Sequence, residues 1–168
     1  MYEMEFAETA MTTWTMLRQT YTAVNKVAEV KLAKVGLTPE KAAVLWACRD
    51  YPGTVTPAEI ARLMFRENQT IAGLLNRMEK DGLVKRVPKR KGHPFTEVKL
   101  TERGRELCDP GVEVLKNVIL ALASDMSVEQ QKRFQDELRP LRDKMLDALH
   151  MEVPRPAIYE GKPIPLVW

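Results

Sequence analysis

Residues 85–91 read KRVPKRK, a stretch in which five of seven side chains are cationic and no acid intervenes. Lysine and arginine at this density bind polyanions, because they pair with phosphate oxygens and release the counterions held there. Three interpretations compete: a flexible linker, a targeting segment, and a surface built to contact phosphates. The sequence on either side of the run distinguishes them.

Positive charge is concentrated in the middle of the chain. From Pro57 to Arg105 there are 12 Lys and Arg against 6 Asp and Glu, whereas the remainder holds 14 against 17, and the net charge is only +3. A basic middle between acidic flanks indicates a polyanionic partner for the middle and a different role for the ends.

Other kinds of chemistry have little support. Cys48 and Cys108 are far apart, and neither His93 nor His150 has a second ligand at metal-binding spacing, so we predict no disulfide framework and no metal site. Because no nucleophile elbow, phosphate loop or HExxH motif occurs, we predict a binding protein rather than an enzyme, with no cofactor. The chain shows no signal peptide and no apolar run of membrane-spanning length, so we expect a cytoplasmic protein without a membrane partner.

Helical spacing of apolar residues predicts the elements that position the basic run. A first long helix ends at Gly36 and carries a stripe of Ala10, Trp14, Leu17, Tyr21, Val24 and Ala28. Thr38-Pro39 starts a second helix, and Thr56-Pro57 starts a third with a capping box to Glu59.

The next helix has Asn68 as its predicted N-cap and ends at Asp81-Gly82. It buries Ile71, Leu74, Leu75 and Met78. The segments LVKRV and FTEVKL then alternate as strands do, so the basic run lies at the tip of a hairpin. Two further helices begin at Thr101 and at the Ser127 capping box, and we expect Pro140 to kink or break the last one.

Two short helices followed by a basic hairpin are the winged helix-turn-helix arrangement, which suits duplex DNA. The face of the 68–82 helix opposite its apolar stripe carries Gln69, Thr70, Gly73, Asn76 and Arg77. Gln69 and Asn76 can bond adenine, and Arg77 can bond guanine or a phosphate. The alternative is an ordinary solvated helix face.

The run AEIARLMFRENQTIAGLLNRMEKD followed by GLVKRVPKRKGHPFTEVKLTERG resembles the multiple antibiotic resistance regulator (MarR) family, over about residues 10–149. The resemblance rests on Leu-x-x-x-Glu-x-x-Gly-Leu-Val at 75–84 and Leu-Thr-Glu-x-Gly at 100–104. It implies a homodimeric bacterial or archaeal transcription regulator whose recognition helix is 68–81. The family usually has Asp-Arg-Arg where this chain has Gly92-His93-Pro94, so we expect this wing to bind phosphate more and read bases less.

The interpretation as a DNA wing is therefore favoured over a linker or a targeting segment. The predicted DNA-binding residues are Asn68, Gln69, Thr70, Gly73, Asn76, Arg77, Lys85, Arg86, Lys89, Arg90, Lys91 and His93. Arg77, Gln69, Thr70 and Asn76 are expected to face bases, and the cations from 85 to 91 are expected to contact the DNA backbone.

The ends of the chain are predicted to dimerise. We expect residues 1–36 and 105–150 to form a helical dimerisation region, 37–104 the winged helix-turn-helix, and 151–168 an extended proline-rich arm. Two copies related by a two-fold axis would read a near-palindromic operator. The alternative is that the terminal helices close a monomeric core.

The resemblance also implies a small aromatic acid or phenol as effector, bound where each lobe meets the helical stalk. The candidate wall residues are Trp14, Leu17, Tyr21 and Trp46, whose alternative role is core packing. Cys108 lies near Arg103 and Arg105, which favours a lowered pKa and makes it a candidate redox sensor.

We therefore predict a mainly α fold, a winged helix-turn-helix with a two-stranded wing and long N- and C-terminal helices that form a dimerisation stalk. The predicted function is a sequence-specific transcriptional repressor that binds double-stranded DNA as a homodimer. Two alternatives stay open: a winged-helix protein-docking module and a non-specific architectural DNA-binding protein.

Overall fold

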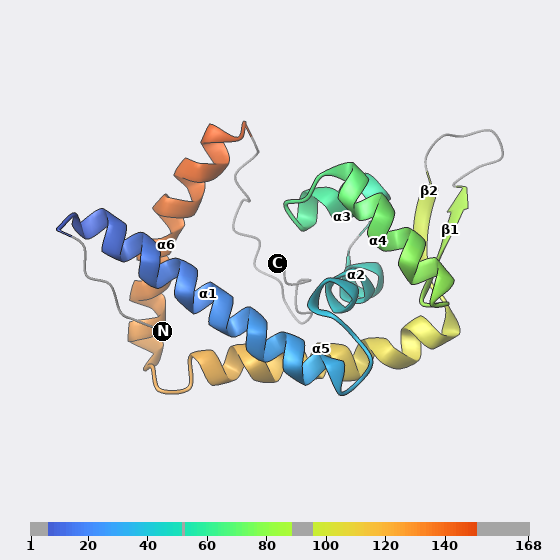
Figure 1. Cartoon of the computed structure of the whole chain (residues 1–168), viewed down its shortest axis with the longest axis horizontal. Helices are drawn as coiled ribbons and strands as arrows, with labels where there is room; N and C mark the ends of the chain where they lie inside the picture. Colours follow the sequence, from blue (N-terminus) through green and yellow to red (C-terminus); the bar gives the residue numbers. More distant parts are fainter. Residues whose placement is uncertain (1–6, 52, 89–95, 151–168) are drawn as a thin grey trace. The chain divides into compact units, whose positions relative to one another are not determined.

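The computed structural model describes residues 7–51, 53–88 and 96–150. These ranges contain, in order, α1 (Thr9–Ala33), α2 (Pro39–Asp50), α3 (Pro57–Leu63), α4 (Asn68–Lys80), β1 (Val84–Pro88), β2 (Thr96–Leu100), α5 (Glu102–Leu122) and α6 (Val128–Ala148) (Figure 1). The two strands form one antiparallel hairpin. The predicted mainly α winged helix-turn-helix is confirmed.

The chain divides into two compact units at a point within α5, after Val118. The first unit contains α1 to β2 and most of α5, and the second contains the end of α5 and all of α6. The whole winged helix-turn-helix therefore lies in the first unit. Within the described ranges, no helix is both long and apolar enough to cross a membrane.

The predicted helix starts are confirmed at Thr38 and at Ser127. The Thr38 hydroxyl accepts a hydrogen bond from the amide of Lys41, with Pro39 as the first helical residue, and Ser127 forms a full capping box with Gln130. The box predicted at Thr56 is only half formed, because the Glu59 carboxylate is engaged by Tyr51 and Arg62 instead. α6 runs past Pro140 without a break.

The predicted N-cap of α4 is wrong by one residue. Asn68 is the first helical residue, and Glu67 occupies the N-cap position without a side-chain capping bond. The preceding turn explains the shift, because Phe65 adopts a left-handed backbone with φ of 49° and the Arg66 amide donates to the Ala61 carbonyl. This leaves Glu67 as the extended residue that enters the helix.

The core of the first unit lies around α2, which is buried along most of its length. α4 contributes the predicted stripe, and the hairpin contributes Val84 and Val98. The largest fully buried side chains come from every helix of this unit and from β1: Leu32, Val44, Leu45, Ile60, Ile71, Leu75, Met78, Val84, Cys108 and Leu115. α4 is thus fixed along its apolar side, with its other side left to solvent.

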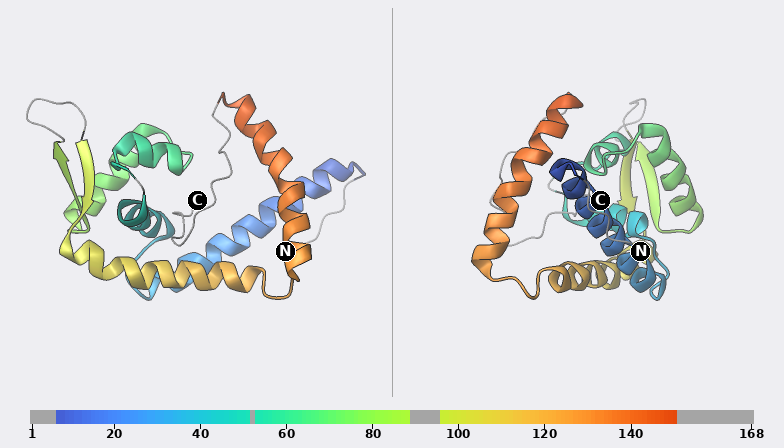
Figure 2. Two further views of the ribbon diagram at one scale, coloured as in Figure 1. Left: turned by 180° about the vertical axis from the view of Figure 1, so that it is seen from behind. Right: turned by 60° about the vertical axis from the view of Figure 1, so that its left-hand side comes forward.

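The hairpin is fixed to the helices at its base. Its register pairs Val84 with Leu100, and the Val98 amide donates to the Val55 carbonyl ahead of α3 at 2.8 Å. Figure 2 shows the two strands beside α4 from behind and from the side. At the start of α5, a Cβ added to Gly104 would lie 2.0 Å from the Leu83 carbonyl oxygen, so only glycine fits there.

α1 and α6 expose large apolar side chains. On α1 these include Trp14, which is 56% exposed, with Leu17, Tyr21 and Val30. On α6 they are Val128, Phe134, Leu141 and Met145. Each helix therefore presents apolar surface that its own unit does not cover.

Candidate nucleic-acid interface

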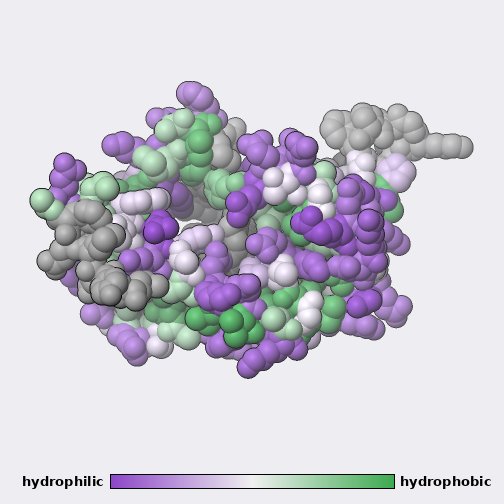
Figure 3. Space-filling model, in the orientation of Figure 1, coloured by the Kyte–Doolittle hydropathy of each residue, from purple (hydrophilic) through white to green (hydrophobic). Residues whose placement is uncertain are grey.

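α4 presents a polar face to solvent. Its buried residues are Ile71, Leu74, Leu75 and Met78, as predicted. Gln69, Thr70, Asn76 and Arg77 are exposed and Gly73 is half-buried. In the space-filling view this part of the molecule is mostly hydrophilic (Figure 3). A helix of this kind is positioned to enter a DNA groove.

Two turns position α4 at its ends. α3 packs against it at the N-terminal side, as expected for a helix-turn-helix. At the C-terminal side Gly82 adopts φ of 69°, and the Leu83 amide donates to the Met78 carbonyl at 2.9 Å. This left-handed residue ends the helix where the sequence predicted and starts β1 beside it.

A hollow of about 560 Å³ lies beside the exposed face of α4, and we call it the α2–α4 hollow. Its polar lining residues are Thr38, Glu40, Lys41, Arg66, Thr70, Arg77, Lys80 and Asp81. Lys41 is bound to Asp81 at 2.7 Å, and this bond lowers the pKa of the Asp81 carboxyl. Arg66, Arg77 and Lys80 form no ion pair with any residue that the structure describes. Their charge is available to phosphates.

Sequence reasoning missed part of this hollow. Lys80 could have been found, since it follows Arg77 by three residues and so shares its helix face. Arg66 lies in the turn before α4, and Thr38 and Lys41 come from the start of α2. No periodic pattern in the sequence places these three beside α4.

On β1, the base of the wing carries one exposed cation and one paired cation. Lys85 on β1 is exposed. Arg86 instead donates to Glu79 of α4 and to the side-chain oxygen of Asn76. The Arg86 guanidinium holds the pKa of the Glu79 carboxyl below its ordinary value. The remaining predicted wing residues Lys89, Arg90, Lys91 and His93 lie outside the described residues.

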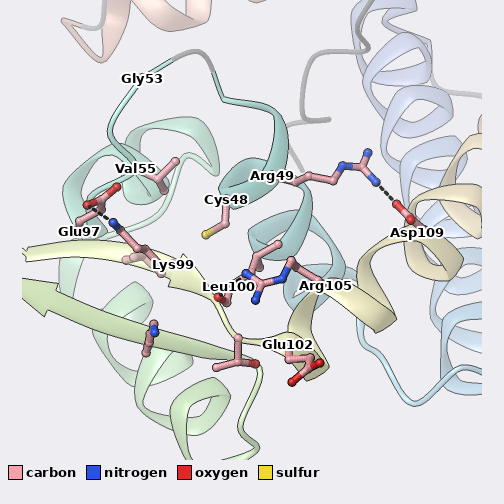
Figure 4. A pocket seen from close by; sticks show the side chains of 13 residues that line it. Cys48, Arg49, Gly53, Val55, Glu97, Lys99, Leu100, Glu102, Arg105 and Asp109 are labelled. Carbon is pink, nitrogen blue, oxygen red and sulfur yellow. Dashed lines mark hydrogen bonds and ion pairs between the residues drawn. The ribbon is translucent and has the colours of Figure 1, made fainter.

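A second hollow, of about 680 Å³, lies between the end of α2, the hairpin and the start of α5 (Figure 4). Its lining combines Val55, Val98 and Leu100 with charged groups, and Arg49 reaches Asp109 across one side. Lys85 and Lys99, which are cross-strand partners, also line it. Cys48 points its sulfur toward this hollow in Figure 4.

The four predicted effector-wall residues are not gathered in either hollow. Trp14, Leu17 and Tyr21 are exposed on α1, whereas Trp46 is 3% exposed within the core. The Trp46 indole N–H is buried and has no partner among the described residues. Trp46 therefore packs in the core, which was the alternative to a role in the effector wall.

The lowered pKa expected for Cys108 is not found. Its thiol is buried, and this burial raises its pKa to about 11, although Arg49 acts in the opposite direction. Burial also raises the pKa of Cys48 to about 12. Both thiols stay protonated at neutral pH, which disfavours a thiolate redox sensor. Arg103 and Arg105 do not contribute to the Cys108 shift.

Known proteins resemble this chain in the segment that contains the winged helix-turn-helix. The model of the MarR family matches residues 35–93, from the end of α1 to the wing. No curated protein sequence matches the chain.

Solved structures match over a greater length. The organohalide-sensing RdhR transcriptional regulator matches with a TM-score of 0.79 at 22% identity, over 96% of both chains, in a ligand-free form and in a form bound to 2,4-dichlorophenol. MepR of S. aureus in a DNA complex matches with 0.70 at 22%, over 86% of this chain and 99% of that one. A mutant MarR from E. coli complexed with operator DNA matches with 0.68 at 17%, over 76% and 91%. At these identities the matches establish a shared fold.

Proposed function

We propose that this chain, whose residues 35–93 are a MarR-family winged helix-turn-helix, is a DNA-binding transcription regulator. One observation carries the proposal: α4 turns a polar face to solvent, opposite a buried stripe. Beside this face lie Arg66, Arg77 and Lys80, which pair with no acid in the part of the chain that the structure describes. A helix enters the major groove, where base edges can be distinguished, while unpaired cations bind the flanking phosphates.

The contacts divide by chemistry. Gln69, Thr70, Asn76 and Arg77 face bases from α4, and Gly73 allows the helix backbone to approach the groove. Arg66, Lys80 and the exposed Lys85 contact the DNA backbone. The cations of the wing tip are assigned the same role on the basis of the sequence. Relatives of this fold solved with DNA support the mode of binding.

The regulator acts as a homodimer on a near-palindromic operator. The support is the apolar surface that α1 and α6 leave exposed, which a second copy can cover. Two recognition helices related by a two-fold axis contact half-sites about one helical turn apart. Such a protein works in the cytoplasm as a repressor when its operator overlaps a promoter.

The effector is a small aromatic acid or phenol that favours the DNA-free arrangement of the two lobes. The form of the RdhR regulator bound to 2,4-dichlorophenol supports this class of ligand. The α1 side chains Trp14, Leu17 and Tyr21 supply the apolar wall. 2,4-Dichlorophenol is therefore the first compound to add to the DNA-binding assay.

Selection from a random duplex library with the purified protein tests this function. We expect enrichment of one palindrome, and binding that weakens steeply as salt rises. Retention of DNA without a consensus would indicate a non-specific architectural protein. No retention at any salt concentration would reject DNA binding and favour a protein-docking module.

A further inference from the structure

We propose that Asn76 reads a guanine, because Arg86 holds its amide oxygen toward β1 and the amide N–H groups are what Asn76 directs at a base. This inference rests on the proposed function and specifies one base contact of it. It differs from the sequence-based expectation that Asn76 bonds adenine.

Three side chains carry the inference. Arg86 lies on β1, and Asn76 and Glu79 lie one turn apart on α4. The Arg86 amide donates to Glu79 Oε1 at 2.7 Å, and its Nε donates to Glu79 Oε2 at 2.8 Å. Its Nη2 donates to Asn76 Oδ1 at 2.5 Å. Arg86 is thus held at three donors by α4.

The chemistry of arginine fixes which end of the Asn76 amide faces it. A guanidinium has donors and no acceptor, so the atom of Asn76 that it contacts must be the oxygen. The amide nitrogen is on the opposite side of the planar group. Asn76 is exposed on the face that α4 turns to solvent, and its two N–H groups donate to no residue that the structure describes.

Adenine and guanine present different hydrogen-bonding groups to the Asn76 amide in the major groove. Bidentate recognition of adenine requires one acceptor and one donor, because adenine presents N7 and the N6 amino group. Guanine presents two acceptors, N7 and O6. The bond to Arg86 uses one of the two lone pairs of the Asn76 oxygen and turns this oxygen toward β1. The amide N–H groups are then what Asn76 directs at a base, and donors match guanine.

Arg86 is then a positioning residue rather than a phosphate contact. Its charge is balanced by Glu79 and both groups are about two-thirds buried, with side-chain exposures of 31% and 30%. A cation that is already paired releases few counterions on binding DNA. Its loss should therefore alter base preference and leave the salt dependence of binding unchanged.

The test compares library selections by the wild type and three variants. Asn76→Ala identifies the base pair, since preference is lost only there. Asn76→Asp keeps the bond to Arg86 and replaces the donors with an acceptor, so guanine gives way to cytosine, whose N4 is a donor. The double variant Arg86→Met, Glu79→Gln leaves no unpaired charge and frees the Asn76 amide, so the preference moves toward adenine by about tenfold.

The matched control is Arg62→Met with Glu59→Gln. It removes another Arg–Glu pair, on α3, and should leave the selected sequence unchanged. Thermal unfolding of each variant checks that it is folded. Asn76→Ala and Asn76→Asp are surface changes, so they test the inference even if the double variant does not fold.

The outcomes separate two failures. A wild type that enriches no sequence rejects the proposed function and this inference together. A wild type that enriches a palindrome, but with adenine at the base pair that Asn76→Ala identifies, rejects this inference alone. So does a double variant with unchanged base preference, or one whose plot of log Kd against log salt is less steep than that of the wild type by about one.

Discussion

On α4, Arg77 and Lys80 are one turn apart and line the same hollow, yet we expect them to contribute differently. Arg77→Met should cost about 1–3 kcal/mol of affinity for the selected operator and relax the preference at one base pair. Lys80→Met should weaken all duplexes alike and reduce the salt slope by about one. Fluorescence anisotropy with the operator and a scrambled duplex, over a range of salt, measures both effects. Equal weakening of both duplexes by Arg77→Met would contradict its assignment to a base.

A substitution at Gly73 should affect the stability of the fold and the affinity for DNA in opposite directions. A Cβ added there would meet only the Arg77 guanidinium, at 3.8 Å, which is ordinary contact. Gly73→Ala should therefore stabilise α4 by about 0.5–1 kcal/mol, since alanine loses less backbone entropy in a helix. If the DNA approaches the helix backbone here, the same variant binds its operator more weakly. Thermal unfolding and anisotropy measure the two quantities, and unchanged affinity would place Gly73 outside the contact.

At this scale, periodicity predicted the exposed face of α4, because burial of Ile71 and Leu75 fixes which side faces solvent. It could not predict the pairing of Arg86, which depends on how β1 lies against α4. The predicted lowering of the Cys108 pKa was wrong for a similar reason. Neighbouring arginines in the sequence suggested a thiolate, whereas burial, a tertiary property, determines the shift.

The elements around α4 are joined at two points that can be tested. The first is the contact between the start of α5 and Leu83, in the link between α4 and β1. A Cβ at Gly104 would lie 2.0 Å from the Leu83 backbone oxygen, which cannot move as a side chain can. Gly104→Ala should therefore destabilise the fold by about 1–3 kcal/mol, as overpacking does. Urea unfolding measures the change. Gly36→Ala cannot serve as the control, because Gly36 has φ of 75° and a side chain there would strain the local backbone without meeting a neighbour.

Gly53→Ala is the matched comparison for Gly104. Its added methyl would meet only the Tyr51 side chain, at 3.3 Å, and this ring can shift. We expect a smaller loss than at Gly104. If both variants lost equal stability, the close approach of α5 to Leu83 would not explain the glycine.

The second point is the Glu79–Arg86 link between α4 and the wing. Arg86 lowers the pKa of Glu79, so the carboxylate form is favoured in the folded chain. The link therefore stabilises the fold above the ordinary glutamate pKa of about 4.3, and this contribution is lost as pH falls through the lower, folded pKa. The difference in unfolding free energy between the wild type and Arg86→Met should be largest near neutral pH and shrink in acid. A difference independent of pH would reject the link.

At the scale of elements, the sequence predicted helix starts where local chemistry determines them. Thr38 and Ser127 cap their helices through bonds within one turn. Asn68 failed as an N-cap because the turn before it, through the left-handed Phe65, sets which residue enters the helix. The Thr56 box is half formed because a tertiary partner, Tyr51, engages Glu59.

For the whole molecule, composition and periodicity predicted helices at both ends with apolar stripes, but a single chain cannot show what covers them. In the structure the stripe of α1 divides. Ala28 and Leu32 are buried in the first unit, whereas Trp14, Leu17 and Tyr21 are exposed. The inner half of α1 thus serves its own core, and the outer half is free for a second copy or an effector.

The exposed half of α1 makes dimerisation testable. If a second copy covers it, Trp14→Glu buries a charge in that interface, which is costly without a partner. The dimer should then dissociate at concentrations where the wild type remains associated. Thr20→Glu is the matched control, because it adds the same charge to the same helix at an exposed polar position. Sedimentation velocity over a range of concentrations measures both, and anisotropy should show that Trp14→Glu also loses affinity for the full palindrome. A Trp14→Glu protein that stays dimeric would show that the interface lies elsewhere. The same test can then be made on α6 with Leu141→Glu, because Leu141 is 50% exposed.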